Sequence, residues 1–128
     1  MHDPIALPNI SPAKLEDGNA IRRLAKEIWY LHYPGIITVQ QIDYMLNQRY
    51  SLKKINQLIG SPSCTWFKVM IEETMWGFGH FEEDASIRSV KVDKLYVHPK
   101  TQGRGFGTTL MRFAETHYGK LGFAKIWL

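Results

Sequence analysis

One stretch of the chain decides the fold that the sequence predicts: Gln102-Gly103-Arg104-Gly105-Phe106-Gly107. The apolar run Leu95-Tyr96-Val97 before it predicts a strand, and the amphipathic run from Thr108 to Leu121 after it predicts a helix. A glycine turn between a strand and a helix leaves several backbone N–H groups without partners at the positive end of the helix dipole. Such a place binds anions, and phosphates above all.

The length and composition of the chain are those of one folded domain. It has 128 residues, of which 45% are hydrophobic and 22% charged. We therefore expect a single domain over 1–128, with helices in about 16–60 and a sheet with the ligand-binding core in about 64–128. The sequence has neither a long apolar run nor a secretory leader pattern, and Cys64 is the single cysteine. These features predict a cytoplasmic location and no intramolecular disulfide.

The net charge of +4 is unevenly distributed along the chain. Residues 72–87 carry five Asp or Glu and no Lys or Arg, whereas residues 88–128 carry eight Lys or Arg and two Asp or Glu. A basic segment beside a phosphate-binding loop suits a polyanionic cofactor, with nucleic acid as the alternative. The acidic segment would either attract a cationic substrate or form a solvated hairpin tip.

The first half of the chain predicts three helices. Apolar residues at helical spacing indicate the first, from about Glu16 to Pro34. Thr38 and Gln41 have the form of a capping box for a second helix that ends near Tyr50. A short third helix, capped by Ser51, should extend to the break at residues 60–63.

The second half of the chain predicts strands around one further helix. The expected strands are a short one near Ile10, then Cys64–Ile71, Met75–Phe81, about Ile87–Val97 and Phe123–Leu128, with a polar turn at Glu82–Ser86. The order of the elements is helices, three antiparallel strands, a crossover helix, and a strand parallel to its predecessor. The predicted fold is therefore mixed, α/β or α+β, with the glycine loop at the carboxyl end of a central strand, where ligands tend to bind.

The strand before the glycine loop contains an irregularity. Val90 and Val92 share one face, but the next apolar pair, Leu95 and Val97, has the opposite parity. A strand of period 2 then requires a bulge or kink near Asp93-Lys94, or burial on both faces. A bulge would release backbone groups that could pair with an extended ligand.

Two common nucleotide motifs do not fit the glycine loop. The loop lacks the closing Gly-Lys-Ser/Thr of a Walker motif. It also fails the dinucleotide fingerprint, because Thr108 occupies the position of the third glycine and no acidic residue follows about 20 positions later.

The same segment closely resembles the acyl-CoA-binding motif of GCN5-related N-acetyltransferases. Leu95-Tyr96-Val97-His98-Pro99 leads into the loop, and Gln102, Gly105 and Gly107 match the family's loop pattern position for position. The resemblance covers most of the chain and is strongest from Val90 to Leu121. It implies a mixed, mostly antiparallel sheet flanked by helices, and acetyl-CoA as co-substrate.

The resemblance also implies which residues hold the cofactor. Backbone N–H groups from about Gly103 to Thr108 would bind the pyrophosphate, Arg104 would add charge, and the pantetheine arm would pair with the strand before the loop. The implied cofactor-binding set is Leu95, Tyr96, Val97, Gln102, Gly103, Arg104, Gly105, Phe106, Gly107 and Thr108.

The implied reaction is direct attack of a primary amine on the thioester, which requires removal of a proton from the amine. Asp93 is the first candidate for the base and Glu82 the second. Glu72, His80 and His98 are further possibilities. The histidine spacing predicts no metal. The acceptor would be a small polyamine-like molecule or a peptide amine, and we expect neither nucleic acid nor membrane as a partner.

The sequence departs from the family pattern at its C-terminal end. The family usually continues after a strand such as residues 124–128, so the predicted fold is a C-terminally truncated form. The final strand would then expose Ile126, Trp127 and Leu128, which could support a homodimer. The alternative function is an acyl-CoA-binding or dimerisation module with weak or no turnover.

Overall fold

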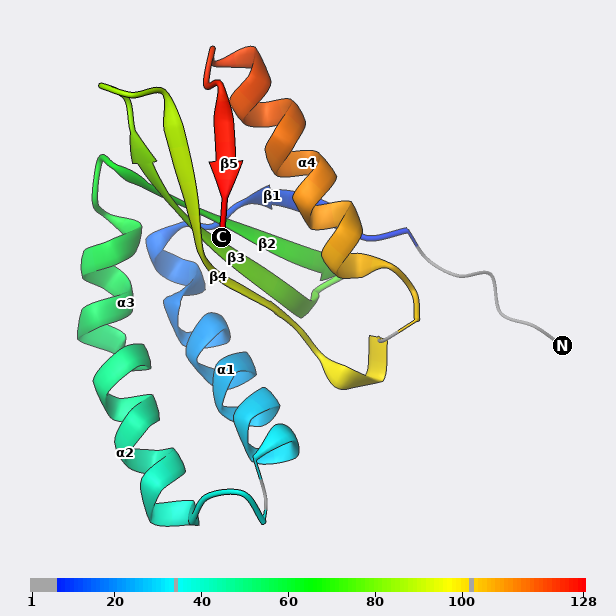
Figure 1. Cartoon of the computed structure of the whole chain (residues 1–128). Helices are drawn as coiled ribbons and strands as arrows, with labels where there is room; N and C mark the ends of the chain where they lie inside the picture. The colour runs from blue at the N-terminus through cyan, green and yellow to red at the C-terminus, as the bar shows by residue number, and fades with distance from the viewer. Residues whose placement is uncertain (1–6, 34, 102) are drawn as a thin grey trace, which may run out of the picture.

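The computed structural model describes residues 7–33, 35–101 and 103–128 (Figure 1). Gln102, one of the predicted cofactor-binding residues, lies outside them. The helices are α1 (Gly18–His32), α2 (Val39–Tyr50), α3 (Leu52–Ile59) and α4 (Phe106–Lys120), with 3-10 turns at Leu15–Asp17 and Pro99–Thr101. The strands are β1 (Asn9–Pro12), β2 (Cys64–Ile71), β3 (Thr74–Asp84), β4 (Ser89–Val97) and β5 (Lys125–Trp127).

The strands form one sheet in the order β1-β2-β3-β4-β5. All neighbouring pairs are antiparallel except β4 and β5, which are parallel and joined by α4. Helices α1, α2 and α3 lie on one face of the sheet and α4 lies on the other (Figure 1). This is the predicted mixed fold with a mostly antiparallel sheet.

The helix boundaries follow the capping signals in the sequence. The Thr38 side chain accepts a hydrogen bond from the Gln41 N–H at 3.1 Å, and the Gln41 side chain accepts one from the Thr38 N–H at 2.9 Å. Ser51 Oγ accepts from the Lys54 N–H at 3.2 Å and starts α3 directly after α2. The predicted capping box and the predicted cap at Ser51 are both confirmed.

The predicted polar turn at Glu82–Ser86 is wrong for its first three residues. Strand β3 continues through Asp84, which pairs with Ser89 of β4. Polarity is compatible with a strand here because Glu83 accepts hydrogen bonds from Thr65 and Tyr118, each at 2.7 Å. These partners come from β2 and α4, so the local sequence could not reveal them.

The irregularity in β4 is a bulge, as one of the two sequence explanations predicted. His80 of β3 pairs with Lys94, and its neighbour Phe81 pairs with Val92, so Asp93 is the extra residue on β4. The extra residue shifts the alternation of the strand by one position, so that the apolar residues before and after it point to the same face. The four apolar residues on either side of it all pack into the core beneath α4: Val90, Val92, Leu95 and Val97.

The bulge is followed by a length of β4 that no strand covers on its β5 side. Strand β5 pairs only with Ser89–Lys91 of β4. Within the described part of the chain, the edge at Val92–Val97 therefore has no strand partner on that side, and Figure 1 shows β4 continuing past the end of β5. An edge of this kind presents free N–H and C=O groups to an extended ligand.

None of the described helices is both long and apolar enough to cross a membrane.

Candidate active site

The glycine loop presents an open, positively polarised helix start. Gly103 and Gly105 have φ values of +83° and +73°, a conformation that favours glycine. Gly105 is the N-cap of α4 and offers no side-chain hydrogen bond, so among the described residues no side chain caps the first-turn N–H groups of Phe106, Gly107 and Thr108. Gly103, Arg104 and Gly105 are exposed. The geometry is that of the predicted anion site.

His98 anchors this loop to the rest of the molecule. Its ring is buried, its Nε2 lies 3.0 Å from Glu27 Oε1 on α1, and its Nδ1 accepts from the Lys100 N–H at 3.0 Å. Because Nδ1 accepts, the neutral ring carries its proton on Nε2 and donates it to Glu27. Both nitrogens of His98 are thus engaged, and we assign this residue to positioning the loop rather than to proton transfer.

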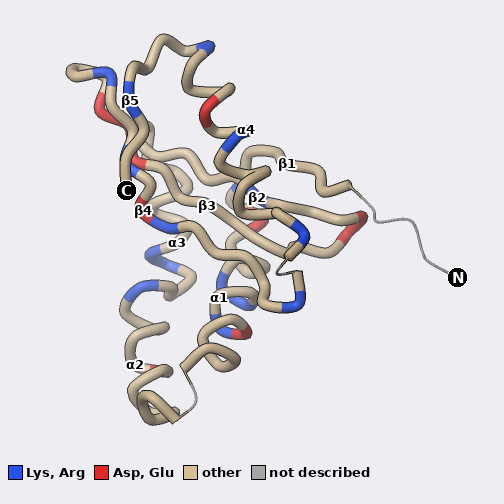
Figure 2. Tube along the Cα trace, turned by 45° about the vertical axis from the view of Figure 1, so that its right-hand side comes forward, with Lys and Arg blue, Asp and Glu red and all other residues tan. Residues whose placement is uncertain are grey.

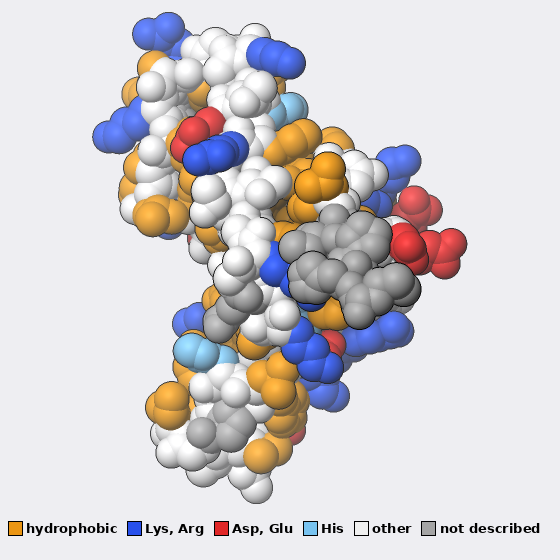
Figure 3. Space-filling view, turned by 90° about the vertical axis from the view of Figure 1, so that its right-hand side faces the viewer, with side chains coloured by type: hydrophobic (Ala, Val, Ile, Leu, Met, Phe, Trp, Pro, Cys, Tyr) orange, Lys and Arg blue, Asp and Glu red, His pale blue; other side chains and the backbone are white. Residues whose placement is uncertain are grey.

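Two hollows adjoin the second half of β4, on the face that carries α1, α2 and α3. One, of about 230 Å³, lies between α1 and the end of β4 and reaches Leu95, Tyr96, Val97 and Pro99. The other, the cleft, has a volume of about 360 Å³ and lies beside the bulge. Its lining is Arg49, Tyr50, Lys54, Leu58, His80, Glu82, Asp93, Lys94 and Tyr96. Figure 3 shows from the side that the molecule narrows between the half with α4 and the half with α1 and α2.

Asp93, the bulged residue, is the centre of a charged network in the cleft. Its Oδ2 lies 3.0 Å from His80 Nδ1 and 2.5 Å from Lys94 Nζ. Partial burial opposes ionisation, but Lys94 and His80 outweigh it and hold the pKa of Asp93 below its ordinary value of 3.8. Asp93 is therefore ionised at neutral pH and already paired with a cation.

His80 lies beneath this network and is fully buried. Its ring stacks on Trp66 at a centroid distance of 4.4 Å and an angle of 16°. Burial, and then the charge of Lys94, lower the pKa of His80 below 6.5, although Asp93 and Glu82 oppose the shift. Because an ionised carboxylate only accepts hydrogen bonds, Nδ1 of the neutral ring donates to Asp93. Nε2 is buried without a hydrogen-bond partner in the described structure.

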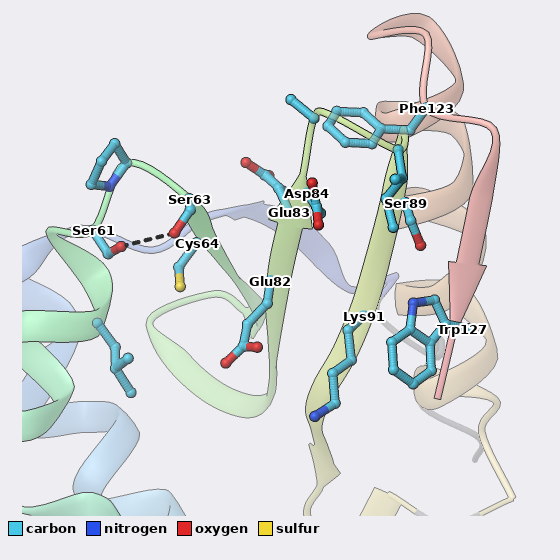
Figure 4. A pocket seen from close by; sticks show the side chains of 14 residues that line it. Ser61, Ser63, Cys64, Glu82, Glu83, Asp84, Ser89, Lys91, Phe123 and Trp127 are labelled. Carbon is cyan, nitrogen blue, oxygen red and sulfur yellow. Dashed lines mark hydrogen bonds between the residues drawn. The ribbon is translucent and has the colours of Figure 1, made fainter.

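Glu82 is the second carboxylate of the cleft. It lies on β3 between Cys64 of β2 and Lys91 of β4, the two residues with which it is in register (Figure 4). Among the described residues, its side chain forms neither a hydrogen bond nor an ion pair, unlike that of Asp93. Glu82 also borders a larger hollow of about 860 Å³ that extends to Phe123 and Trp127.

The donor atoms of His80, Glu82 and Asp93 all lie within 4.8 Å of one another. Three such groups could hold a divalent cation, but the ammonium of Lys94 already contacts Asp93 and approaches His80 Nδ1 at 3.4 Å. Lys94 therefore already supplies a positive charge at Asp93, one of the three groups.

The acidic segment 72–87 does not form one patch. Glu72 and Glu73 lie in the turn between β2 and β3, whereas Glu82, Glu83 and Asp84 lie at the far end of β3 (Figure 2). The structure places Glu72 outside the cleft, so this candidate base is not brought together with Asp93. Of the acidic residues in this segment, Glu82 alone lines the cleft.

Several residues of the cleft were not among the sequence candidates. Tyr50 and Arg49 end α2, Lys54 lies in the first turn of α3, and Lys94 lies on β4. Lys94 Nζ lies 5.9 Å from the ring centroid of Tyr50 and 5.8 Å from that of Trp66. The alternation of β3 and β4 could have indicated that His80 and Lys94 share a face, but the helical residues carry no such signal.

A family model described as acetyltransferase (GNAT) family matches residues 20–128. The chain belongs to this family. The match covers the three helices, the bulged strand and the glycine loop. Membership supports acetyl-CoA as the co-substrate that the sequence predicted.

Individual relatives of this GNAT protein are distant. Spermidine N(1)-acetyltransferase of Thermoplasma acidophilum is 25% identical over 120 residues, which are 91% of this chain and 73% of the relative. The crystal structure of PaiA N-acetyltransferase from Thermoplasma acidophilum in complex with coenzyme A has a TM-score of 0.81 at 23% identity, over 91% of this chain and 74% of that one.

An aminoglycoside acetyltransferase from an uncultured soil metagenomic sample, solved with trehalose, has a TM-score of 0.71 at 13% identity, over 95% of this chain and 77% of its own. At such identities the two structures show that the fold is shared.

Proposed function

We propose that the protein is an N-acetyltransferase that moves an acetyl group from acetyl-CoA to a primary amine by direct attack. The observation that carries this proposal is the alignment of three features along one strand. The bulge at Asp93, the uncovered edge at Val92–Val97 and the glycine start of α4 follow one another on β4 and its loop. One after another along the chain, they would provide a cleft for the acceptor, a docking edge for the cofactor and an anion site.

The cofactor would be held by the loop and the strand edge. The N–H groups of Gly103 and of Gly105 to Thr108 offer donors for the pyrophosphate. The N–H of Arg104 already donates to the Thr101 carbonyl at 3.1 Å, so Arg104 adds positive charge through its side chain, and Gln102 belongs to the same motif. Leu95, Tyr96 and Val97 line the hollow beside α1 and offer backbone groups to the pantetheine arm. Bound acetyl-CoA supplies an activated thioester carbonyl.

The cleft would receive the acceptor amine. An amine with a pKa near 10 is mostly protonated at neutral pH, so a base must remove a proton before attack. We assign this role to Glu82, whose carboxylate has no cation partner among the described side chains. Asp93, the other candidate, would keep His80 and Lys94 in place and contribute negative charge beside the amine. Glu82 would pass the proton to solvent at the mouth of the cleft.

The proposal is tested by thiol release. The purified protein is incubated with acetyl-CoA and a panel of amines that includes spermidine, a lysine peptide and an amino acid, and free CoA is measured. We expect amine-dependent release above the rate of acetyl-CoA hydrolysis. Calorimetry with acetyl-CoA separates the outcomes: binding without release indicates a CoA-binding module, and absence of binding at millimolar cofactor contradicts the proposal.

A further inference from the structure

The cleft is more basic than a site for a polyamine should be. Three cationic side chains line it, Arg49, Lys54 and Lys94, against the two carboxylates Glu82 and Asp93. Lys94 is neutralised by Asp93. Burial keeps His80 uncharged at neutral pH, because it lowers the pKa of that ring.

The remaining two cations, Arg49 and Lys54, have no acidic partner among the described residues. Within the described ranges, neither Arg49 nor Lys54 lies within ion-pair distance of an Asp or Glu side chain. The Arg49 guanidinium instead lies 5.8 Å from the ring centroid of Trp29, a cation–π contact that fixes its direction without reducing its charge. Lys54 lies in the first turn of α3, whose N-cap Ser51 directly follows α2. Both cations are exposed, so they can meet a ligand.

The charges are separated across the cleft. Glu82, Asp93 and Tyr96 come from β3 and β4, whereas Arg49 and Lys54 come from the adjoining ends of α2 and α3. Figure 2 shows basic residues along this part of the helical layer. A ligand that spans the cleft would thus meet a carboxylate wall on the sheet and a cationic wall on the helices.

We infer that the acceptor is a primary amine that carries an anionic group, such as a carboxylate, a few atoms from its nitrogen. The amine would face Glu82 on the sheet wall, and the anion would face Arg49 and Lys54 on the helical wall. Charge-assisted hydrogen bonds of this type are stronger than neutral ones. A polyamine would instead bring a second ammonium against two unpaired cations, which penalises it. This inference rests on the proposed acetyltransferase function.

Matched acceptors test the inference. The kcat/KM for acetylation is measured with 4-aminobutanoate, with its neutral amide 4-aminobutanamide, and with spermidine. Because a hydrogen bond to a charged group contributes about 1.5–3 kcal/mol, we expect the carboxylate to be preferred over the amide by about 10- to 100-fold, mainly through KM. Spermidine should be the poorest of the three acceptors.

Variants of the helical wall complete the test. The double variant Arg49→Gln/Lys54→Gln should reduce the preference for the carboxylate to less than about threefold. Lys53→Gln is the matched control, because Lys53 is an exposed neighbour on α3 outside the cleft. Calorimetry with acetyl-CoA confirms that each variant is folded.

Equal use of the amide and the carboxylate, or a preference that survives in the double variant, would overturn the inference while leaving the acetyltransferase proposal intact. Absence of turnover with every amine would overturn both.

Discussion

The two faces of the sheet differ in packing and in polarity. Beneath α4 the contacts are apolar and tightly packed, and Val92, Phe106 and Leu110 are nearly inaccessible to solvent. The face under α1, α2 and α3 begins as a similar core but opens into a cleft where Asp93, Lys94 and Tyr96 meet. The bulge at Asp93 produces this difference, since it keeps the apolar residues on one face while adding a charged residue on the other. One face is thus a closed core, and its opposite carries the cleft in which we propose the chemistry.

The largest effect expected on the face with the cleft follows removal of the proposed proton acceptor, Glu82. Glu82→Gln keeps the size of the side chain but cannot accept the proton, so kcat should fall by about 10²- to 10⁴-fold. The measurement is CoA release at saturating amine. Glu73→Gln, in the exposed turn between β2 and β3, is the control and should retain activity. A Glu82 variant with the activity of the unmodified protein would exclude this residue as the base.

Substitutions on the packed face should instead change the stability of the folded protein. Leu110 of α4 is fully buried against the sheet, and Leu110→Ala should lower the free energy of unfolding by about 2–5 kcal/mol through lost contacts and a cavity. Denaturant unfolding measures the change. Arg112→Ala, exposed on the same helix, should change the stability by less than about 0.5 kcal/mol. Equal effects of the two substitutions would contradict the packing described.

A substitution in the glycine loop, which connects β4 to α4, should change the affinity for acetyl-CoA. Gly105 has a φ of +73°, so Gly105→Val forces a β-branched residue into a strained conformation and places methyl groups where phosphate oxygens would approach. We expect acetyl-CoA affinity to fall by about 100-fold or more, which calorimetry would detect. Gly119→Ala, late in α4 with open space around it, is the control. Retained affinity in the Gly105 variant would remove the loop from the binding site.

The smallest effect concerns acid sensitivity, which should originate on the face with the cleft. Burial lowers the pKa of His80 in the folded state below the ordinary value of 6.5 that it has in the unfolded chain. At a pH between the folded-state pKa and 6.5, the unfolded chain therefore binds more protons than the folded protein. Stability should therefore be complete above pH 6.5 and decline as the pH falls below it. The slope that His80 adds is at most about 1.4 kcal/mol per pH unit.

The His80→Gln variant should lose this component of the pH slope. His32→Gln, at the exposed end of α1, should keep it. Unfolding free energies between pH 7 and pH 5 provide the comparison. A slope that is the same in both variants would show that another group is responsible.

The sequence predicted more of the packed face than of the cleft. The strand parity of Val90, Val92, Leu95 and Val97 predicted either a bulge or burial on both faces, because the period of a strand is a local property, and the structure shows the bulge. The extent of β3 was not predictable in the same way, since Glu83 depends on partners from β2 and α4. Asp93 and Glu82 were predicted as candidates, but the engagement of Asp93 by Lys94 was not.

The sequence by itself determined the class of fold, the helix caps and the glycine start of α4 at Gly105, and it reduced the irregularity in β4 to two explanations. These follow from periodicity, capping and glycine geometry, which act over a few residues. Only the tertiary structure decided the composition of the cleft, where Arg49 and Lys54 from helices face Glu82 and Asp93 from strands. The physical reason is that a charge acts through space, so its effect depends on neighbours that are distant in the chain.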